Sequence, residues 1–190
     1  KLANFIIKEG FDKPNLQYLL EEAKASGIEE VILIVSYTKQ EIKDYFSHNV
    51  KLEAKLLNSG KENEYKLVYD LGEFIKVTFV NQAEPLGLGH AILCAKEAVN
   101  GEDFAIILGD DLVYSESKPA LAQLIEYYTK YNASIIGVQK VKHEDTKKYG
   151  IIDIKTEVEK DLFDVNTFIE KPNVEDAPSD YAISGRYIFK

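Results

Sequence analysis

The stretch Phe104–Asp111, which reads Phe-Ala-Ile-Ile-Leu-Gly-Asp-Asp, decides the fold of this chain. Five apolar residues run without interruption before a glycine and two adjacent carboxylates. A short continuous apolar run that ends in a turn signal predicts a fully buried strand of the kind found in parallel sheets. Open α/β sheets bind their ligands at the carboxyl ends of such strands. We therefore expect Asp110 and Asp111 at a ligand-binding edge.

The two carboxylates have two interpretations. A pair of carboxylates can hold a hard cation such as Mg2+, which takes one or two of them together with phosphate oxygens. Gly109 leaves room for a sharp turn or for the close approach of a ligand. The alternative is a polar turn that caps the next segment, because Gly-Asp-Asp is common in loops. These residues alone leave both interpretations open.

The flanking sequence alternates between strand and helix patterns. Helical spacing or helix-start signals predict helices at 15–26, from Thr38 to Phe46, from Gly89 to Val99 and after Pro119. Apolar runs predict strands at 5–7, 31–35, 76–80, 134–138 and 165–169, and residues 8–14 are expected to form a loop. Strands that alternate with helices predict parallel βαβ units and therefore an α/β fold.

Residues 49–73 depart from this alternation. They are rich in Lys, Glu, Leu and Asn, and their apolar positions predict two short helices joined near Gly60. Such an excursion between a helix and the next strand suits a lid, an arm or a dimer contact. We expect one domain over residues 1–190 with a helical arm inserted at about 49–73, and the arm favours a homo-oligomer.

Composition excludes several classes of protein. The 190 residues are 45% hydrophobic and 29% charged, which is typical of a globular chain. The formal net charge of −9 argues against a nucleic-acid partner, because such binding relies on Lys and Arg. No apolar stretch approaches the ~20 residues of a membrane span, so we expect no membrane partner and a cytoplasmic location. Cys94 is the only cysteine, which excludes an intrachain disulfide, and its apolar neighbours predict a buried, inert thiol.

Two further turns contain residues that could bind a ligand. Gly87 and Gly89 lie at the start of a predicted helix, where backbone N–H groups could approach a phosphate or a base. A tight strand-to-helix turn explains them equally well, and both the third glycine of the dinucleotide fingerprint and a P-loop ending are missing. Glu170-Lys171-Pro172 suits a surface ion pair, or an acid for sugar hydroxyls beside a lysine for a phosphate.

The order and spacing of these signals is more specific than any one of them. The motifs are Gln82-x-x-Pro-x-Gly-x-Gly-His-Ala, Leu108-Gly-Asp-Asp, Tyr149-Gly-Ile-Ile-Asp, Glu170-Lys-Pro and Ala182-Ile-Ser-Gly-Arg-Tyr. This series resembles the sugar-1-phosphate nucleotidylyltransferases, and among them the branch that uses UTP and glucose 1-phosphate. The resemblance runs from about Asp12 to Tyr187 and implies a Rossmann-like three-layer α/β domain with a mostly parallel central sheet.

The resemblance also implies a reaction. UTP and glucose 1-phosphate give UDP-glucose and pyrophosphate when the sugar phosphate attacks the α-phosphorus in line, with Mg2+ as the cofactor. The protein has to position two polyanions and offset their charge. The alternatives are the same chemistry with dTTP or another sugar, and a regulatory protein that binds a nucleotide sugar without catalysis.

Each matched residue takes a role from the resemblance. Asp110 and Lys171 are the expected catalytic residues, Asp110 as the Mg2+ ligand and Lys171 at the glucose phosphate. The expected substrate-binding residues are Gln82 at the uracil edge, Gly87 at the base and ribose, Asp111, Gly150 beside the sugar, Glu170 at the glucose hydroxyls, Lys171, and Gly185 in the strand that lines the sugar pocket.

The chain departs from the family at its start. The family has a Gly-x-Gly-Thr-Arg loop after the first strand, which cradles the triphosphate and supplies an arginine, and this sequence lacks it. We expect Ile7 and Lys8 not to be covalent neighbours, with the loop left out between them; a true bond would favour the non-catalytic alternative. We also expect a C-terminal part beyond residue 190, with the second metal-binding aspartate.

Overall fold

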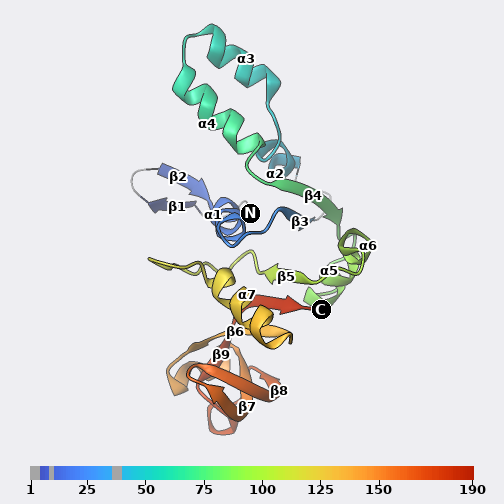
Figure 1. Ribbon diagram of the computed structural model, residues 1–190, viewed down its shortest axis with the longest axis vertical. Coiled ribbons are helices and arrows are strands. Elements are labelled where there is room, and N and C mark those ends of the chain that lie inside the picture. The colour runs from blue at the N-terminus through green and yellow to red at the C-terminus, as the bar shows by residue number, and fades with distance from the viewer. Residues whose placement is uncertain (1–4, 9–10, 36–39) are drawn as a thin grey trace. The chain divides into compact units, whose positions relative to one another are not determined.

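The computed structural model describes residues 5–8, 11–35 and 40–190, and Figure 1 shows its elements. The chain divides into two compact units. Unit 1 comprises Lys1–Leu19 and Asp103–Lys190, and unit 2 comprises Leu20–Glu102. None of the helices formed by the described residues combines the length and the apolar character that a membrane crossing requires.

Unit 2 is built around a parallel pair of strands. Its segment of the chain carries α1 (Asn15–Ala25, which begins in unit 1), β3 (Glu30–Val35), α2 (Gln40–Tyr45), α3 (Val50–Asn58), α4 (Glu62–Gly72), β4 (Lys76–Asn81), α5 (Leu88–Cys94) and α6 (Lys96–Val99). β3 and β4 pair in parallel from Glu30 opposite Lys76 to Val35 opposite Asn81. The predicted parallel unit is therefore confirmed here, with α2, α3 and α4 in the crossover.

The end of α1 follows from its sequence. Gly27 adopts a φ of +86°, which favours glycine, and the chain turns away there. Its N–H donates to the carbonyl of Lys24, and the N–H of Ile28 donates to the carbonyl of Ala23 over 3.1 Å. These bonds satisfy carbonyl groups that the end of a helix leaves without partners. The predicted helix stop at Gly27 is confirmed.

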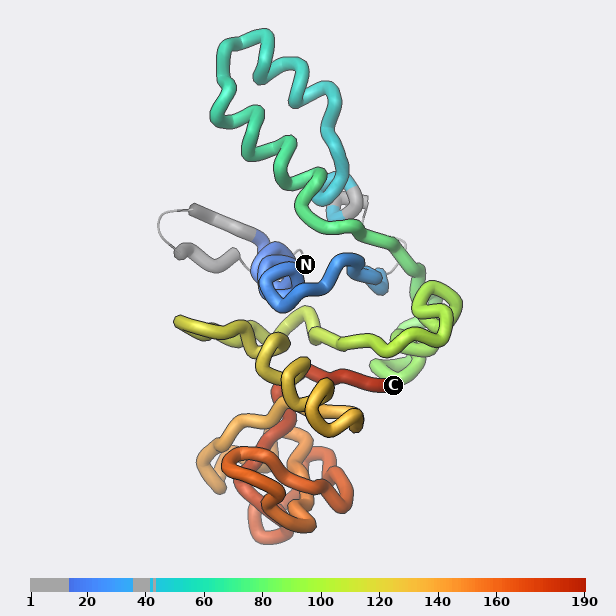
Figure 2. Tube along the Cα trace, viewed as in Figure 1, coloured from blue at the N-terminus to red at the C-terminus, as the bar shows by residue number. Residues whose placement is uncertain are grey.

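The two helices predicted for residues 49–73 are present as α3 and α4, which run side by side (Figure 2). The side chain of Asn49 accepts a hydrogen bond from the N–H of Leu52 and caps α3. Gly60, with a φ of +68°, lies in the turn between the helices. Neither helix contains a buried residue. The arm therefore gains its stability from caps and from contact between its own helices.

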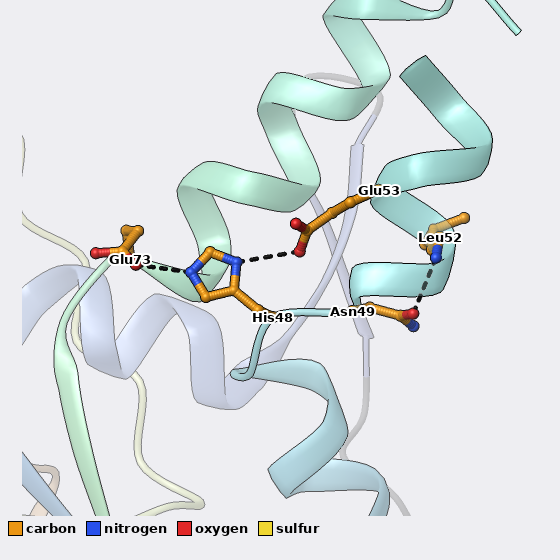
Figure 3. Close-up of polar contacts among 5 residues, drawn as sticks. All are labelled: His48, Asn49, Leu52, Glu53 and Glu73. Atoms are coloured by element: carbon orange, nitrogen blue, oxygen red, sulfur yellow. Dashed lines mark hydrogen bonds and ion pairs between the residues drawn. The ribbon is translucent and has the colours of Figure 1, made fainter. Parts of the chain in front are cut away.

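His48 joins the two ends of this arm (Figure 3). Its Nδ1 lies 3.1 Å from a carboxylate oxygen of Glu53 in α3, and its Nε2 lies 2.7 Å from one of Glu73, just after α4. The ring of Tyr69 lies against it, with centroids 4.9 Å apart. The hydrogen bond with Glu73 and then that with Glu53 raise the pKa of His48 above its ordinary value. An imidazolium donates to both carboxylates at once, which neutral imidazole cannot do.

We expect the replacement His48→Gln to remove a pH-dependent contribution to stability. Because the folded state raises the pKa of His48, the contribution is present below the unfolded pKa of about 6.5 and is lost as the pH rises through the folded value. The melting temperature of wild type should therefore exceed that of the variant by more at about pH 6 than at about pH 8.5. Equal differences at the two pH values would contradict this role.

Unit 1 holds a five-stranded sheet. Its elements are β1 (Phe5–Lys8), β2 (Phe11–Pro14), β5 (Phe104–Ile107), α7 (Ala120–Tyr131), β6 (Ile135–Lys140), the 3-10 turn η1 (His143–Lys148), β7 (Gly150–Glu159), β8 (Leu162–Glu170), the 3-10 turn η2 (Val174–Asp176) and β9 (Tyr181–Phe189). The sheet order is β5-β9-β7-β8, and β6 pairs with the other side of β9. The strand at the end of the chain thus lies in the middle of the sheet.

Every pairing found in the five-stranded sheet is antiparallel. Ile188 of β9 pairs with Ala105 of β5 on one side and with Ile135 of β6 on the other. β5 and β6 therefore run in the same direction, joined through α7 as the predicted βαβ order requires, but with β9 inserted between them. The mixed α/β class is confirmed, and the expectation of a mostly parallel sheet does not hold for this larger sheet, because β9 runs back between its neighbours.

Two local expectations need correction. β5 is half-buried rather than fully buried, because β9 is the one described strand that pairs with it. Residues 11–14 form β2, paired antiparallel with β1, where a loop was expected. β1 includes Ile7 and Lys8, which pair with Asp12 and Phe11. The expectation that a loop is left out between these two residues stays a prediction. Thr38, expected to cap α2, lies outside the described residues.

Candidate active site

A bulge in β9 shapes the first part of the site. Ile136 of β6 pairs with Tyr187, whereas Val138 pairs with Ile183, so a single residue of β6, Gly137, faces residues 184–186 of β9. A side chain on Gly137 would place its Cβ 2.9 Å from Ser184 Oγ, so the bulge favours glycine opposite it. β-Bulges redirect side chains and are frequent next to active sites. Here the bulge turns Gly185 and Arg186 toward the end of β5.

Gly185 lies against the carboxylate turn. Its φ is +43°, and a Cβ built on it would lie 2.9 Å from Asp111 Oδ2. Its carbonyl accepts a hydrogen bond of 2.9 Å from the N–H of Leu108, the residue after β5. The backbone conformation favours glycine, and a larger residue here would have to displace the Asp111 side chain. Gly185 therefore lies beside Asp111, and its role in the site stays a prediction.

Arg186 supports the same turn from the interior. It is the only arginine of the chain, and its side chain is 0% exposed. Its Nη2 donates to the carbonyl of Asp111 over 2.9 Å, and its Nη1 donates to the carbonyl of Gly185. A planar guanidinium holds carbonyls in fixed directions. Asp110 is exposed, and the backbone of its neighbour Asp111 is held by the hydrogen bond from Arg186.

The second part of the site lies where β7 begins and β8 ends. Gly150 pairs with Glu170, and a Cβ on Gly150 would lie 3.1 Å from Glu170 Oε2. Lys171 adopts a φ of +46°, and its N–H donates to the carbonyl of Tyr149. Its Nζ lies 3.6 Å from Glu170, with the side chains 63% and 75% exposed. An exposed pair of this kind is weak, so both groups remain able to bind a ligand.

Tyr187 follows Arg186 in β9. Burial raises the pKa of its phenol, and the negative charges of Asp111 and then Glu170 raise it further. The phenol therefore stays protonated at neutral pH.

Gln82 and Gly87 form a separate group in unit 2. Gln82 directly follows β4, and its N–H donates to the carbonyl of Val35 at the end of β3. Gly87, with a φ of +97°, precedes α5. Its carbonyl accepts from Gln82 Nε2 over 3.2 Å. Both residues therefore lie at the carboxyl end of the parallel pair, the edge at which α/β sheets bind ligands.

The structure thus brings the predicted residues together in three sets. Two lie in unit 1, one with Asp110, Asp111 and Gly185 and one with Gly150, Glu170 and Lys171; the third, Gln82 and Gly87, lies in unit 2. Sequence reasoning gave no role to Arg186 or Tyr187. Arg186 could have been noticed as the one arginine of the chain, placed in a largely apolar strand. Tyr187 has no comparable feature in the sequence.

Few side chains in the described part of the chain are placed to act as metal ligands. Among the described residues, no group of three or more His, Cys, Asp or Glu side chains is arranged to hold a metal ion. Mg2+ commonly takes one or two carboxylates and completes its shell with water and substrate phosphates. Asp110 and Asp111 suit that arrangement, in which the substrate supplies the remaining oxygens.

Comparison with known proteins places the chain in a family. The family model described as "Nucleotidyl transferase" matches residues 6–190, which is nearly the whole chain. The chain belongs to the nucleotidyl transferase family. The matched residues include the carboxylate turn, the bulged β9 and the Glu170–Lys171 pair.

Two similar proteins are named as UTP–glucose-1-phosphate uridylyltransferases. The chain is 42% identical over 177 residues to the UTP–glucose-1-phosphate uridylyltransferase YngB of Bacillus subtilis (strain 168). It is 46% identical over 180 residues to a UTP–glucose-1-phosphate uridylyltransferase of Streptococcus pyogenes. Each match covers 93% of this chain and 59% of the relative. This nucleotidyl transferase therefore spans about three fifths of the length of those relatives.

A solved structure is similar as well. It is a UDP-glucose pyrophosphorylase in complex with UDP-glucose, with a TM-score of 0.80 and 36% identity. The match covers 93% of this chain and 64% of that one. The fold of this nucleotidyl transferase is therefore shared with a protein that holds UDP-glucose.

Proposed function

We propose that this chain is a nucleotidyltransferase that makes UDP-glucose and pyrophosphate from UTP and glucose 1-phosphate. The observation that carries the proposal is the arrangement of unit 1, in which an aspartate turn lies beside β9 and a Glu-Lys pair lies at the end of β8. The first suits a metal and phosphates, and the second suits a sugar phosphate. The names of the relatives and the UDP-glucose complex support the same substrates.

The residues divide the work by their chemistry. Asp110, with Asp111 beside it, would hold Mg2+, which supplies positive charge to offset that of the phosphates. Lys171 binds the phosphate of glucose 1-phosphate, and Glu170 accepts hydrogen bonds from the glucose hydroxyls. A phosphate oxygen of the sugar attacks the α-phosphorus of UTP, and the bond to pyrophosphate breaks. Catalysis then rests on positioning and charge, without a covalent enzyme intermediate.

The test is a set of paired substrates. UTP or dTTP is supplied with glucose 1-phosphate or galactose 1-phosphate in the presence of Mg2+, and pyrophosphate release is measured. We expect the fastest release with UTP and glucose 1-phosphate. Faster release with dTTP or with galactose 1-phosphate would move the assignment to another sugar-1-phosphate nucleotidylyltransferase.

We expect Lys171→Ala to weaken the use of glucose 1-phosphate selectively. Losing one charged contact to a phosphate should raise the KM for glucose 1-phosphate about tenfold or more. The KM for UTP should stay within about twofold, because Lys171 is assigned to the sugar phosphate. Steady-state kinetics with each substrate varied in turn measures both values.

A matched control for Lys171 is Lys160→Ala. Lys160 is exposed at the turn of the β7–β8 hairpin, the opposite end from the pairing of Gly150 with Glu170. This variant removes the same charge from the same hairpin and should leave both KM values unchanged. Equal increases for the two substrates in Lys171→Ala would show that Lys171 is misassigned.

One observation favours a second function, that of a regulatory protein that binds a nucleotide sugar without catalysis. The family's triphosphate loop carries an arginine, whereas the one arginine of this chain is buried in β9 and holds backbone carbonyls. UDP-glucose binding without pyrophosphate release from any substrate pair would establish this alternative. A homo-oligomer, a single domain and a cytoplasmic location stay predictions.

A further inference from the structure

The Gln82 amide is held by two partners on its nitrogen side. Its Nε2 lies 3.2 Å from the carbonyl oxygen of Gly87 and 3.0 Å from Nδ1 of His90. His90 lies in the first turn of α5, and the N–H of Gln82 is tied to Val35 at the end of β3. Both ends of this contact are therefore fixed by secondary structure.

The Gly87 carbonyl identifies the atom that faces it. A backbone carbonyl oxygen can only accept a hydrogen bond, so the amide atom beside it must be the NH2 nitrogen and not the oxygen. The orientation of the Gln82 amide is thus determined by chemistry rather than by the assignment of similar atoms. The same NH2 group faces His90 Nδ1.

His90 must then accept at Nδ1. This requires neutral imidazole with its proton on Nε2. Cys94 Sγ lies 3.9 Å from that Nε2, one helical turn further along α5, and is partly exposed rather than buried as expected. A protonated His90 would direct an N–H at the Gln82 NH2 group, which cannot accept it. Neutral His90 is therefore the form that matches the observed amide.

Both N–H groups of the Gln82 amide are used in this arrangement. Among the described residues, no hydrogen bond to its oxygen Oε1 is found, so the oxygen is the atom left for a ligand. Uracil presents a donor, N3–H, on its pairing edge, whereas cytosine presents an acceptor at N3. An amide oxygen pairs with the first and repels the second.

We propose that His90 is a positioning residue that fixes the Gln82 amide with its oxygen toward the base, and so makes the site prefer uracil over cytosine. This inference rests on the proposed function, because Gln82 is assigned to the base there. It extends that function by naming the residue that controls discrimination between bases. His90 does not need to touch the nucleotide.

The test compares two variants of nearly equal shape. His90→Asn keeps an acceptor, Oδ1, close to the position of Nδ1, whereas His90→Leu has a similar volume and no acceptor. Affinities for UDP-glucose and CDP-glucose are measured by calorimetry on wild type and both variants. His90→Ala removes the acceptor without adding branched bulk and provides a second comparison, and melting temperatures report on the fold.

We expect wild type to prefer UDP-glucose. The ratio of the two affinities should fall about tenfold in His90→Leu and in His90→Ala, because the amide is then free to rotate. It should be largely retained in His90→Asn. An unchanged ratio in folded His90→Leu or His90→Ala, or an equal loss in His90→Asn, would overturn the role of His90.

The affinity ratio also tests this inference independently of the proposed catalytic activity. Binding does not require turnover, so discrimination can be measured even if the protein releases no pyrophosphate. A wild type that binds UDP-glucose with an unchanged ratio in the variants would overturn the inference alone. A wild type that binds neither nucleotide sugar would overturn both.

Discussion

Asp110→Asn should lower Mg2+-dependent formation of UDP-glucose by about a hundredfold or more, because a metal ligand contributes several kcal/mol to stabilising charge in the transition state. Asn has nearly the same shape as Asp but lacks the charge that attracts a hard cation. The side chain is exposed, so the melting temperature should change little. Initial rates across a range of Mg2+ concentrations measure the effect.

A control for this variant is Asp161→Asn. Asp161 lies in the turn of the β7–β8 hairpin with a φ of +62°, a conformation that Asn also tolerates. The change removes the same charge far along the hairpin from Glu170 and should leave the rate unaltered. If Asp110→Asn were as active as wild type, Asp110 would not belong to the metal site.

Arg186→Ala should destabilise the protein by about 3 kcal/mol. The substitution leaves a cavity at a fully buried position, and it removes the guanidinium that donates to the carbonyl groups of Asp111 and Gly185. In the folded variant the carbonyl group of Asp111 would lose this partner, whereas in the unfolded chain it bonds to water. Urea unfolding of wild type and variant measures the difference in the free energy of unfolding.

The milder variant Arg186→Lys distinguishes a structural role from one in positioning. Lys keeps the charge but not the planar fork that holds two carbonyls. If Arg186 positions the aspartate turn, the Mg2+ concentration needed for half-maximal rate should rise severalfold in this variant while the KM for glucose 1-phosphate stays constant. Equal changes in both quantities would indicate general loosening of the fold instead.

The sequence predicted helices and strands correctly where neighbouring residues alone determine them. Gly27 ends α1 because its left-handed backbone supports the bonds that close a helix, and that preference belongs to the residue itself. The apolar run before Gly109 likewise became β5, and the two arm helices formed on either side of Gly60. In each case the information lies within a few neighbouring residues.

Features that depend on distant partners could not be predicted in this way. Nothing in residues 104–108 states that β9, more than seventy residues later, runs back beside them, and so the strand direction was wrong. Arg186 was missed because a charged residue in a strand is expected to face water, whereas here a bulge opposite Gly137 gives it interior partners. The contact between Gln82 and His90 depends on how β4 meets α5.

The central claim is tested most directly by measuring UDP-glucose and pyrophosphate together in one reaction. The protein is incubated with UTP, glucose 1-phosphate and Mg2+, and both products are quantified over time, with a parallel reaction that contains a chelator of divalent cations. The account predicts that the two products form in equal amounts and that the chelator stops both. Tight binding of UDP-glucose without formation of either product would contradict it and establish a protein that binds the nucleotide sugar without making it.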